Sequence, residues 1–505
     1  MVRSLLAQSL ALGGLLTSNI PLASALPQND GSAALQTCLT EAVGGDASRA
    51  QFPSEENFST ADVKPYNRQY QYTPSAVMYP KTATEVGDIV KCASKYTRKV
   101  QARSGGHDYV NKGIGGANGA VVVDLKNFNQ LSVNQDSGIA TIGPANGLKA
   151  VVEGLNNNGQ LMIPHGTSAT VGIGGHTLIG GFGPVTRRSG LALDSLREVE
   201  VVLANGTVTR ASEDTNADLF WAMRGAGQSF GIATSFDFQT SPQPAGNVVT
   251  YQYNVTNSDS AILAETLASW QTLISDPDLS RDLFTLAVYQ GNTLLIRGNY
   301  WGSRADFEAL RLAERVPNID TSAPGTTLTE SSWIDMYEDT FRFTDTQLQD
   351  AFFYARTAAV TKSDLPSNET LAAVLKQLHD GDAGHAGWWV LIDINGGAVA
   401  DVAVDATAFP HRDALYYFQI YVSSTEKEID DAGFGFVDKA MGLLQEGDAA
   451  ASERYGVYPG YPDARLNNPQ QMYWGSNLPR LEKIKAVLDP EDVFSTAHGV
   501  KPARS

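Results

Sequence analysis

The chain has 505 residues, a length that allows two to four domains. Its hydrophobic share of 42% excludes a disordered protein and is ample for hydrophobic cores. Its 55 acidic residues outnumber its 37 basic residues, so the formal net charge is −18. Such a chain is not expected to bind nucleic acid or an anionic membrane, because both require a basic surface. The two cysteines exclude a disulfide-dense scaffold and a cysteine-rich metal site.

The first residues have the pattern of an export signal. Arg3 precedes an apolar run from Leu5 to Leu16, and Ala23-Ser24-Ala25 fits a cleavage site with small residues. We therefore expect residues 1–25 to be a secretory signal peptide and the mature protein to be extracellular. A buried N-terminal helix is the alternative. The run is too short for a membrane span, and no later stretch has 18 uninterrupted apolar residues.

Secretion would place the two cysteines in an oxidising compartment. Cys38 and Cys92 lie in stretches with a helical pattern and could pair there, although two unrelated buried thiols would also fit. Four sequons suit N-glycosylation of a secreted protein, at Asn57, Asn205, Asn254 and Asn368.

The part of the chain before residue 243 alternates short strands with helices. Hydrophobic periodicity predicts helices over 33–43, 83–96 and 148–156, and strands over 100–103, 121–125, 139–142 and 236–238. Ser241-Pro242-Gln243-Pro244 is the best candidate for a domain boundary, because its prolines interrupt regular structure.

Beyond this boundary the pattern is that of an α+β domain built on an antiparallel sheet. Strands are expected over 248–253, 284–289, 293–300, 387–394 and 414–422, and helices over 260–273, 304–315 and 429–444. The segment after Ala450 is rich in Tyr, Pro and Asn and ends with a helix over 479–488.

Two glycine-rich stretches indicate close approach of the backbone to a ligand. The first, Arg103-Ser104-Gly105-Gly106-His107, directly follows a predicted strand, and the second runs from His165 to Gly183. Successive glycines let backbone N–H groups converge on an anion such as phosphate, although tight turns are the alternative. The standard nucleotide motifs do not fit, because no Gly-Lys-Ser/Thr occurs and Thr177 replaces the last glycine of a dinucleotide fingerprint.

These stretches resemble the two signature segments of flavin-linked oxidases with the vanillyl-alcohol-oxidase/PCMH fold. The nearest group is the berberine-bridge-enzyme-like oxidases, which include fungal oligosaccharide oxidases and secondary-metabolite oxidases. The resemblance covers nearly all of the mature chain, and its motifs are Arg-Ser-Gly-Gly-His at 103–107, Val-Gly-Ile-Gly-Gly-His at 171–176, Asn216 to Gly225, Tyr-Pro-Asp at 461–463, Tyr473 to Leu478 and Asp489 to Phe494.

The resemblance implies a two-lobed α+β molecule. A PCMH-type FAD-binding domain would span 26–243, a substrate domain with a helix-covered antiparallel sheet would span 244–450, and residues 451–505 would return to the FAD domain. A disulfide between Cys38 and Cys92 is common in the group. We expect a monomer.

The resemblance further implies that His107 is bonded covalently to the flavin ring methyl. A neutral imidazole is a nucleophile near neutral pH and suits this chemistry, whereas a histidine with a purely structural role is the alternative. Many relatives add a second link through a cysteine at the position of Ser168, so a single link is expected here.

The same resemblance assigns the remaining cofactor contacts. Val171 falls where relatives carry a small residue that admits O2 to the flavin. No metal is expected, and His176 is placed beside the cofactor. The expected FAD-binding residues are Arg103, Ser104, Gly105, Gly106, His107, Asp108, Tyr109, Thr167, Ser168, Val171, Gly172, Gly174, Gly175, His176, Gly181, Gly231, Ile232 and Tyr458.

Oxidation of an alcohol also requires a base, because a proton leaves together with the hydride. Tyr461 matches the family's catalytic tyrosine, and Asp393 matches the acid that pairs with it in oligosaccharide oxidases. A phenol is a poor base at neutral pH unless its proton is relayed. Asp393 lies in an apolar strand and should therefore have a perturbed pKa. The structural alternatives are a packed aromatic for Tyr461 and a turn-capping carboxylate for Asp393.

Two other classes of function fit the sequence less well. Gly227-Gln228-Ser229-Phe230-Gly231 matches the G-x-S-x-G elbow of serine hydrolases, but a helix is predicted before the serine and a strand after it, the reverse of what an elbow needs. A binding protein that lost turnover is disfavoured, because both Tyr461 and Asp393 are present.

The sequence therefore predicts a secreted oxidase that moves a hydride from a small molecule to FAD and then to O2, releasing H2O2. Asp393 favours a carbohydrate substrate. The missing second link, and Leu391 and Ile392 beside Asp393, favour a smaller, phenolic or polyketide-like secondary metabolite, which we prefer.

Overall fold

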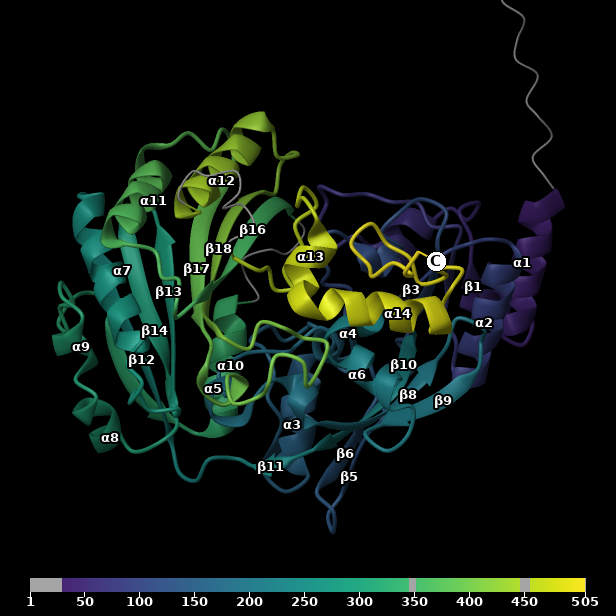
Figure 1. Cartoon of the computed structure of the whole chain (residues 1–505), viewed down its shortest axis with the longest axis horizontal. Coiled ribbons are helices and arrows are strands. Elements are labelled where there is room, and N and C mark those ends of the chain that lie inside the picture. The colour runs from purple at the N-terminus through teal and green to yellow at the C-terminus, as the bar shows by residue number, and fades with distance from the viewer. Residues whose placement is uncertain (1–29, 345–350, 446–454, 505) are drawn as a thin grey trace, which may run out of the picture.

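The computed structural model describes residues 30–344, 351–445 and 455–504. The expected signal peptide and its cleavage site lie outside these residues. The described chain forms the α+β fold that the sequence predicts, with helices packed against antiparallel and mixed sheets (Figure 1).

The strands form three larger sheets and one short pair. A four-stranded sheet has the order β1 (Ala50–Gln51), β2 (Ala76–Met78), β4 (Val121–Asp124), β3 (Val100–Arg103), in which β4 runs parallel to β2 and to β3. A five-stranded antiparallel sheet has the order β5 (Leu131–Asn134), β6 (Ile139–Ile142), β10 (Ile232–Gln239), β8 (Leu196–Val202), β9 (Val208–Ser212). The short pair joins β7 (Leu161–Met162) to β11 (Ser241–Pro242).

The third larger sheet is antiparallel throughout and has seven strands. Its order is β15 (Thr327–Ser331), β12 (Val248–Thr256), β14 (Thr293–Tyr300), β13 (Leu283–Gln290), β17 (Gly387–Ile394), β18 (Ala414–Ser424), β16 (Phe352–Thr361).

The helices fall into groups along the chain. Before residue 243 they are α1 (Asp30–Ala42), α2 (Ala83–Lys95), α3 (Leu148–Asn157), α4 (Ile173–Leu178), α5 (Thr186–Ser189) and α6 (Ala217–Ala226). After it they are α7 (Ser260–Ile274), α8 (Arg304–Ala309), α9 (Leu312–Arg315), α10 (Trp333–Thr344), α11 (Asn368–Asp380), α12 (Asp431–Leu444), α13 (Pro469–Trp474) and α14 (Leu478–Leu488).

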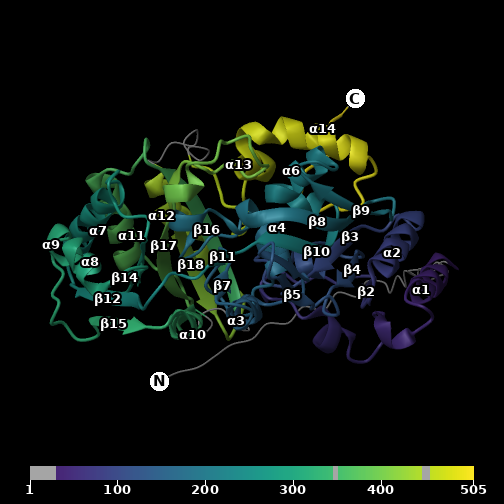
Figure 2. The same ribbon diagram turned by 90° about the horizontal axis from the view of Figure 1, so that it is seen from below.

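Each larger sheet has its own hydrophobic core. Helices α7, α11 and α12 cover the outer face of the seven-stranded sheet, and Figures 1 and 2 show them at one end of the molecule. Helices α3, α6 and α14 pack around the five-stranded sheet, while α1 and α2 pack against the four-stranded sheet at the opposite end.

The C-terminal segment lies against the first part of the chain. The Val100 N–H donates to the Val493 carbonyl at 2.9 Å. The Nζ of Lys485, which is fully buried on α14, donates to the Ser229 carbonyl and to Asp489 Oδ2, both at 2.6 Å. These bonds hold the C-terminal segment beside the four- and five-stranded sheets, which are formed by residues far away in the sequence.

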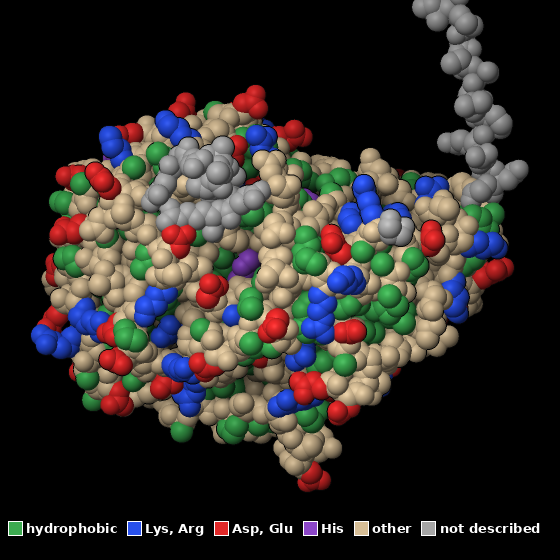
Figure 3. All heavy atoms as spheres, viewed as in Figure 1, with side chains coloured by type: hydrophobic (Ala, Val, Ile, Leu, Met, Phe, Trp, Pro, Cys, Tyr) green, Lys and Arg blue, Asp and Glu red, His purple; other side chains and the backbone are tan. Residues whose placement is uncertain are grey.

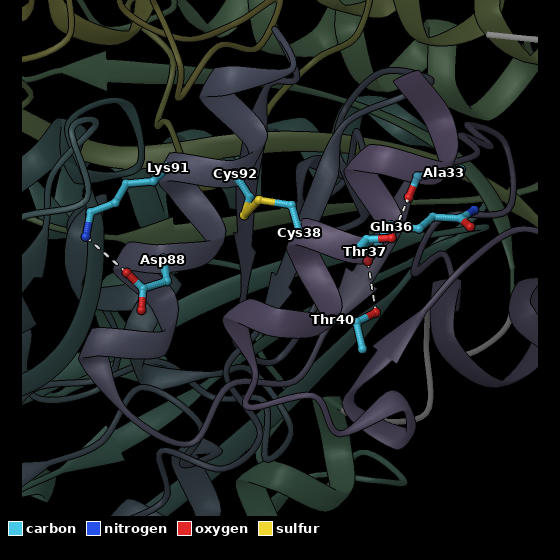
Figure 4. The surroundings of a disulfide bond; sticks show 8 residues. All are labelled: Ala33, Gln36, Thr37, Cys38, Thr40, Asp88, Lys91 and Cys92. Carbon is cyan, nitrogen blue, oxygen red and sulfur yellow. Dashed lines mark hydrogen bonds and ion pairs between the residues drawn. A yellow bond between two sulfur atoms is a disulfide. The ribbon is translucent and has the colours of Figure 1, made fainter. Parts of the chain in front are cut away.

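A disulfide joins the two N-terminal helices. Cys38 of α1 and Cys92 of α2 are bonded, with their Cα atoms 5.9 Å apart (Figure 4). Helix α2 begins where the sequence predicts, because the Thr82 side chain accepts a hydrogen bond from the Glu85 N–H and caps the first turn. The disulfide expected from the sequence is therefore present.

One predicted helix is wrong. Residues 304–315 form two short helices, α8 and α9, because Arg311 between them has φ +53° and so leaves the right-handed helical region. Helices α10 and α11 and strand β16 were not predicted, although β16 lies at one edge of the large sheet.

The surface carries charged side chains of both signs. On the face drawn in Figure 3, basic side chains are interspersed with acidic ones.

Three of the four asparagines expected to be glycosylated, Asn57, Asn205 and Asn368, are exposed. Asn254 is half-buried, and its Nδ2 donates to the Pro324 carbonyl at 3.0 Å. Among the helices described, none is long and apolar enough to cross a bilayer.

Replacing both Cys38 and Cys92 with serine should lower the free energy of unfolding. The bond closes a loop across a sequence separation of 54 residues, so chain entropy predicts a loss of about 4 kcal/mol as an upper value. Denaturant unfolding of the double variant and of the oxidised wild type measures the difference. Equal midpoints for the two proteins would contradict a stabilising role.

Candidate functional site

A deep cavity lies between the seven-stranded sheet on one side and the four- and five-stranded sheets on the other. Its walls include the ends of β3 and β10, both glycine-rich stretches, the inner face of β17 and the loop around residue 460. Every residue that the sequence assigned to FAD or to catalysis lines this cavity, except Gly181. Gly181 has φ +83°, and its N–H donates to the hydroxyl of Tyr458, which does line the cavity, at 3.0 Å.

The two glycine-rich stretches meet backbone to backbone. A Cβ on Gly105 would lie 2.3 Å from the Gly172 nitrogen, and a Cβ on Gly172 would lie 1.9 Å from Ser104 Oγ. A Cβ on Gly174 would lie 2.7 Å from the Pro144 side chain. Since no side chain fits at these three positions, the backbone itself forms this wall of the cavity.

His107 lies at the cavity surface between two contacts. Its Nε2 is 2.8 Å from Thr170 Oγ1, and its ring packs on the ring of Tyr66 with centroids 4.4 Å apart and an angle of 31°. The imidazole is therefore held both on one face and at one edge.

The charged side chains near His107 are paired locally. Arg103 is buried, and its Nε donates to Asp124 Oδ2 at 2.7 Å. Asp108 accepts the N–H groups of Val110 and Lys112 and forms an ion pair with the Lys112 ammonium at 3.0 Å. Both residues line the cavity, but their charges are already compensated by protein partners.

His176 is a neutral histidine in the wall. Its Nε2 accepts a hydrogen bond from the Gly166 N–H at 2.9 Å, and burial lowers its pKa to about 3. Burial likewise lowers the pKa of His165 to about 4. In the part of the chain that the structure describes, no cluster of three or more His, Cys, Asp or Glu side chains could hold a metal ion.

Asp393 is a buried carboxyl on the inner face of β17. It is 6% exposed, and burial raises its pKa to about 7, while a hydrogen bond from Gln419 Nε2 at 2.9 Å acts in the opposite direction. It pairs with Leu286 and Tyr417 inside the sheet. It is thus part of the strand and not the cap of a turn, and its perturbed pKa agrees with the prediction.

Tyr461 lies in a cluster of aromatic rings that lines the same cavity as Asp393. Its ring stacks on Tyr109 with centroids 5.6 Å apart and meets Tyr458 edge-on at 5.0 Å. Burial raises the Tyr461 pKa well above its usual value, and the charge of Asp393 raises it further. A hydrogen bond with Gln419 lowers it.

Gln419 and Tyr421 connect these groups and were not predicted. Gln419 Oε1 accepts a hydrogen bond from the Tyr421 hydroxyl, which lies 2.9 Å from the Tyr109 hydroxyl. Both residues lie on β18, with side chains on the same face as that of Tyr417. A glutamine within the apolar run 414–422 was the signal in the sequence that could have indicated Gln419.

The alternation of β17 corrects one detail of the expected pocket. Trp389, Leu391 and Asp393 line the cavity, whereas Ile392 points into the opposite hydrophobic core. Ile392 therefore does not form part of the substrate wall. Trp389 stacks on Tyr421 with an interplanar angle of 7° and centroids 4.9 Å apart.

The serine-hydrolase alternative is wrong. Ser229 is buried in a short 3-10 helix that follows α6 and precedes β10, so the strand–turn–helix order of a nucleophile elbow is reversed. Its Oγ accepts a hydrogen bond from the Val500 N–H at 3.1 Å and serves to hold the C-terminal segment.

The cavity suits an elongated flavin nucleotide. Its backbone wall lets a ligand approach closer than side chains would permit, and apolar residues such as Leu125, Leu148 and Ile232 provide a surface for flat rings. The imidazole of His107 lies where this wall meets the aromatic cluster. The residues present therefore fit FAD.

Comparisons with known proteins agree with this fit. Residues 74–212 match the FAD binding domain family, and residues 457–501 match the family described as berberine and berberine like. The FAD-linked oxidoreductase sorD of Penicillium rubens is 37% identical over 486 residues, covering 93% of this chain and 99% of that protein.

Solved structures show the same fold over nearly the whole chain. A xylooligosaccharide oxidase from Myceliophthora thermophila C1, in complex with xylobiose, superposes with a TM-score of 0.84 at 29% identity, covering 94% of this chain and all of the other. A glucooligosaccharide oxidase from Acremonium strictum, described with a 6-S-cysteinyl, 8α-N1-histidyl FAD, gives 0.82 at 29% identity with the same coverage.

A match of 37% identity over almost the full length of both chains establishes the family. The protein belongs to the berberine-bridge-enzyme-like FAD-linked oxidoreductases, and it is a FAD-dependent enzyme.

Proposed function

We propose that this protein is a secreted, monomeric oxidase that oxidises a small secondary metabolite and passes the electrons to O2, releasing H2O2. FAD is bound through a single covalent link to His107. Residues 26–243 and 451–505 bind the cofactor, and residues 244–450 bind the substrate. The observation that carries the proposal is that one cavity brings together His107, Tyr461 and Asp393.

FAD, when bound, would accept a hydride from a substrate carbon. The backbone wall around Gly105 and Gly172 would hold it. Val171, beside this wall, stands at the position where relatives carry a small residue that admits O2. Ser168 has no thiol for a second link, so His107 alone fixes the cofactor.

The chain's own part in the chemistry is removal of the substrate proton. A free tyrosinate at position 461 is unfavourable, because burial and Asp393 both raise the phenol pKa. In this proposal the proton is passed on as it arrives: Tyr461 takes the substrate proton, and the Asp393 carboxylate, which shares Gln419 as a hydrogen-bond partner with Tyr461, is the group that finally holds it. Gln419, bonded to Asp393 at 2.9 Å, keeps that carboxylate in place.

The wall next to Asp393 favours a flat, mostly apolar substrate. Leu391, Trp389 and Phe182 line it, and the hydroxyls of Tyr109 and Tyr421 are directed at each other. An aromatic or conjugated ring would stack against such a surface, with its reacting hydroxyl near Tyr461.

An oligosaccharide is the second candidate. It is favoured by the retained pair of Tyr461 and Asp393 and by the similarity to oxidases of xylo- and glucooligosaccharides. The wide stacked face of Trp389 and Tyr421 could also bind a sugar ring.

A panel of phenolic and polyketide-like alcohols and of oligosaccharides, followed by peroxide release, separates the two candidates. Turnover of the ring compounds with a kcat/KM at least tenfold above that of any sugar supports our proposal. The reverse preference would assign the protein to the oligosaccharide oxidases. Substrate turnover without peroxide would refute the assignment of O2 as the acceptor.

Replacing Tyr461 with Phe should slow flavin reduction by about 100-fold or more, because a positioned acid–base group contributes about that factor. The bound yellow colour should remain. Stopped-flow absorbance under anaerobic conditions measures the rate. Tyr289→Phe is the matched control, because this buried hydroxyl faces the other core and has no hydrogen-bond partner among the described residues. Unchanged reduction in Y461F would refute the assigned base.

Asp393 should produce a pH dependence of the same rate. Its pKa is raised to about 7, so the carboxyl is protonated below this pH and cannot accept a proton, and it becomes ionised above it. Flavin reduction should therefore rise with pH through about 7. D393N should be slow and lack this rise.

The exposed Asp382→Asn serves as the control and should keep the wild-type profile. A rise of the same shape in D393N would show that another group titrates.

A further inference from the structure

A short series of hydrogen bonds runs from the first glycine-rich loop to the buried carboxyl of Asp393. The hydroxyls of Tyr109 and Tyr421 lie 2.9 Å apart, and the Tyr421 hydroxyl donates to Gln419 Oε1. Gln419 Nε2 in turn donates to Asp393 Oδ2 at 2.9 Å. Tyr109 follows His107 by two residues, so these bonds connect the two sides of the cavity.

The order of donors and acceptors in this series is fixed. A hydroxyl has a single hydrogen, whereas an amide carries two on nitrogen and none on oxygen. Because the hydrogen of Tyr421 is given to Gln419 Oε1, the bond between the two hydroxyls is donated by Tyr109. Tyr421 is buried, and its ring stacks on Trp389 with centroids 4.9 Å apart. Its hydroxyl is therefore held in one place beside the amide oxygen.

The amide nitrogen of Gln419 serves both groups that handle the substrate proton. Its bond to Asp393 favours the ionised carboxylate and lowers the pKa of that carboxyl, against the effect of burial. Gln419 also forms a hydrogen bond that lowers the pKa of Tyr461, which is the effect of a donor on a phenol. A reversed amide would present its oxygen to both groups instead.

We propose that Tyr421 is a positioning residue for proton transfer: by donating to Gln419 Oε1, it prevents reversal of the amide and keeps Nε2 directed at Asp393. This inference rests on the proposed function, in which Tyr461 and Asp393 take up the substrate proton.

The surroundings of Asp393 leave this amide in control. Burial and the Gln419 bond are the causes that shift its pKa, so in the described part of the chain no ion pair competes with the amide. Its partner on β13 is the apolar Leu286. The titratable side chains around it, from β18 and from the loops near residues 109 and 460, are tyrosines whose pKa is raised by burial, and they are neutral near pH 7: Tyr109, Tyr417, Tyr421, Tyr458 and Tyr461.

Replacing Tyr421 with Phe should raise the pH at which Asp393 ionises. The ring would remain stacked on Trp389, but the Gln419 amide would be free to reverse and to accept the O–H of the protonated carboxyl. Because this reversal favours the neutral form, the midpoint should rise by about half a pH unit to one unit. That shift is a bias of about threefold to tenfold, the range of one hydrogen bond.

Infrared difference spectra measure this midpoint and require no substrate. Full-length, FAD-containing protein is titrated across neutral pH, and the protonated-carboxyl band that is present in the wild type and absent in D393N is followed. Tyr416→Phe is the matched control. The buried Tyr416 hydroxyl lies on the same strand but donates to Gln271 Oε1 at 2.8 Å, in the core beneath the outer helices, so Y416F should leave the midpoint unchanged.

Gln419→Met separates the direction of the amide from the packing of the Tyr421 ring. Q419M removes the donor and should raise the midpoint by itself, while Y421F should add nothing in the Q419M background. An unchanged midpoint in Y421F, or an equal effect of Y421F with and without the amide, would overturn the role of Tyr421. If Y421F does not fold, Y421M also removes the hydroxyl and is judged by the same outcomes.

The pH profile of flavin reduction provides a second readout. The rise that Asp393 produces should move to higher pH in Y421F and stay in place in Y416F. The proposed function fails separately, if D393N and Y461F reduce the flavin as fast as the wild type, because the infrared midpoint does not depend on turnover.

Discussion

The site depends on the contact between Gly105 and Gly172, where two loops approach so closely that neither residue can carry a side chain. The first loop continues to His107 and the second continues into α4 and the backbone wall around Gly174. Because both loops are locked by one contact, the histidine and the wall keep a fixed relation to each other. A methyl group at either glycine would push them apart and change the shape of the whole cavity.

The opposite wall is built by simple alternation along β17. Trp389, Leu391 and Asp393 face the cavity, while Trp388 and Ile392 pack into the core beneath the outer helices. One strand thus stabilises its domain with one face and equips the site with the other. A register slip of one residue would turn Ile392 toward the cavity and the carboxyl of Asp393 into the hydrophobic core. Because that exchange is unfavourable, the large apolar face also fixes the position of Asp393.

The sequence predicted those features that are encoded locally. The apolar run around Asp393 placed this residue on a buried strand, and the glycine clusters marked the backbone wall. Contacts between strands were out of reach, because the bond from Gln419 to Asp393 depends on how β17 pairs with β18. The break at Arg311 was missed because a left-handed arginine leaves no mark in helical periodicity.

The charged side chains of the cavity differ in how they are compensated. Arg103 and Asp108 line the cofactor side, but each is already bonded to a neighbouring opposite charge. Asp393 instead receives a hydrogen bond from the neutral amide of Gln419, so its charge is not cancelled by that partner. In a medium of low dielectric constant such a charge acts strongly on nearby groups. The charge of Asp393 therefore acts on Tyr461, whose pKa it raises.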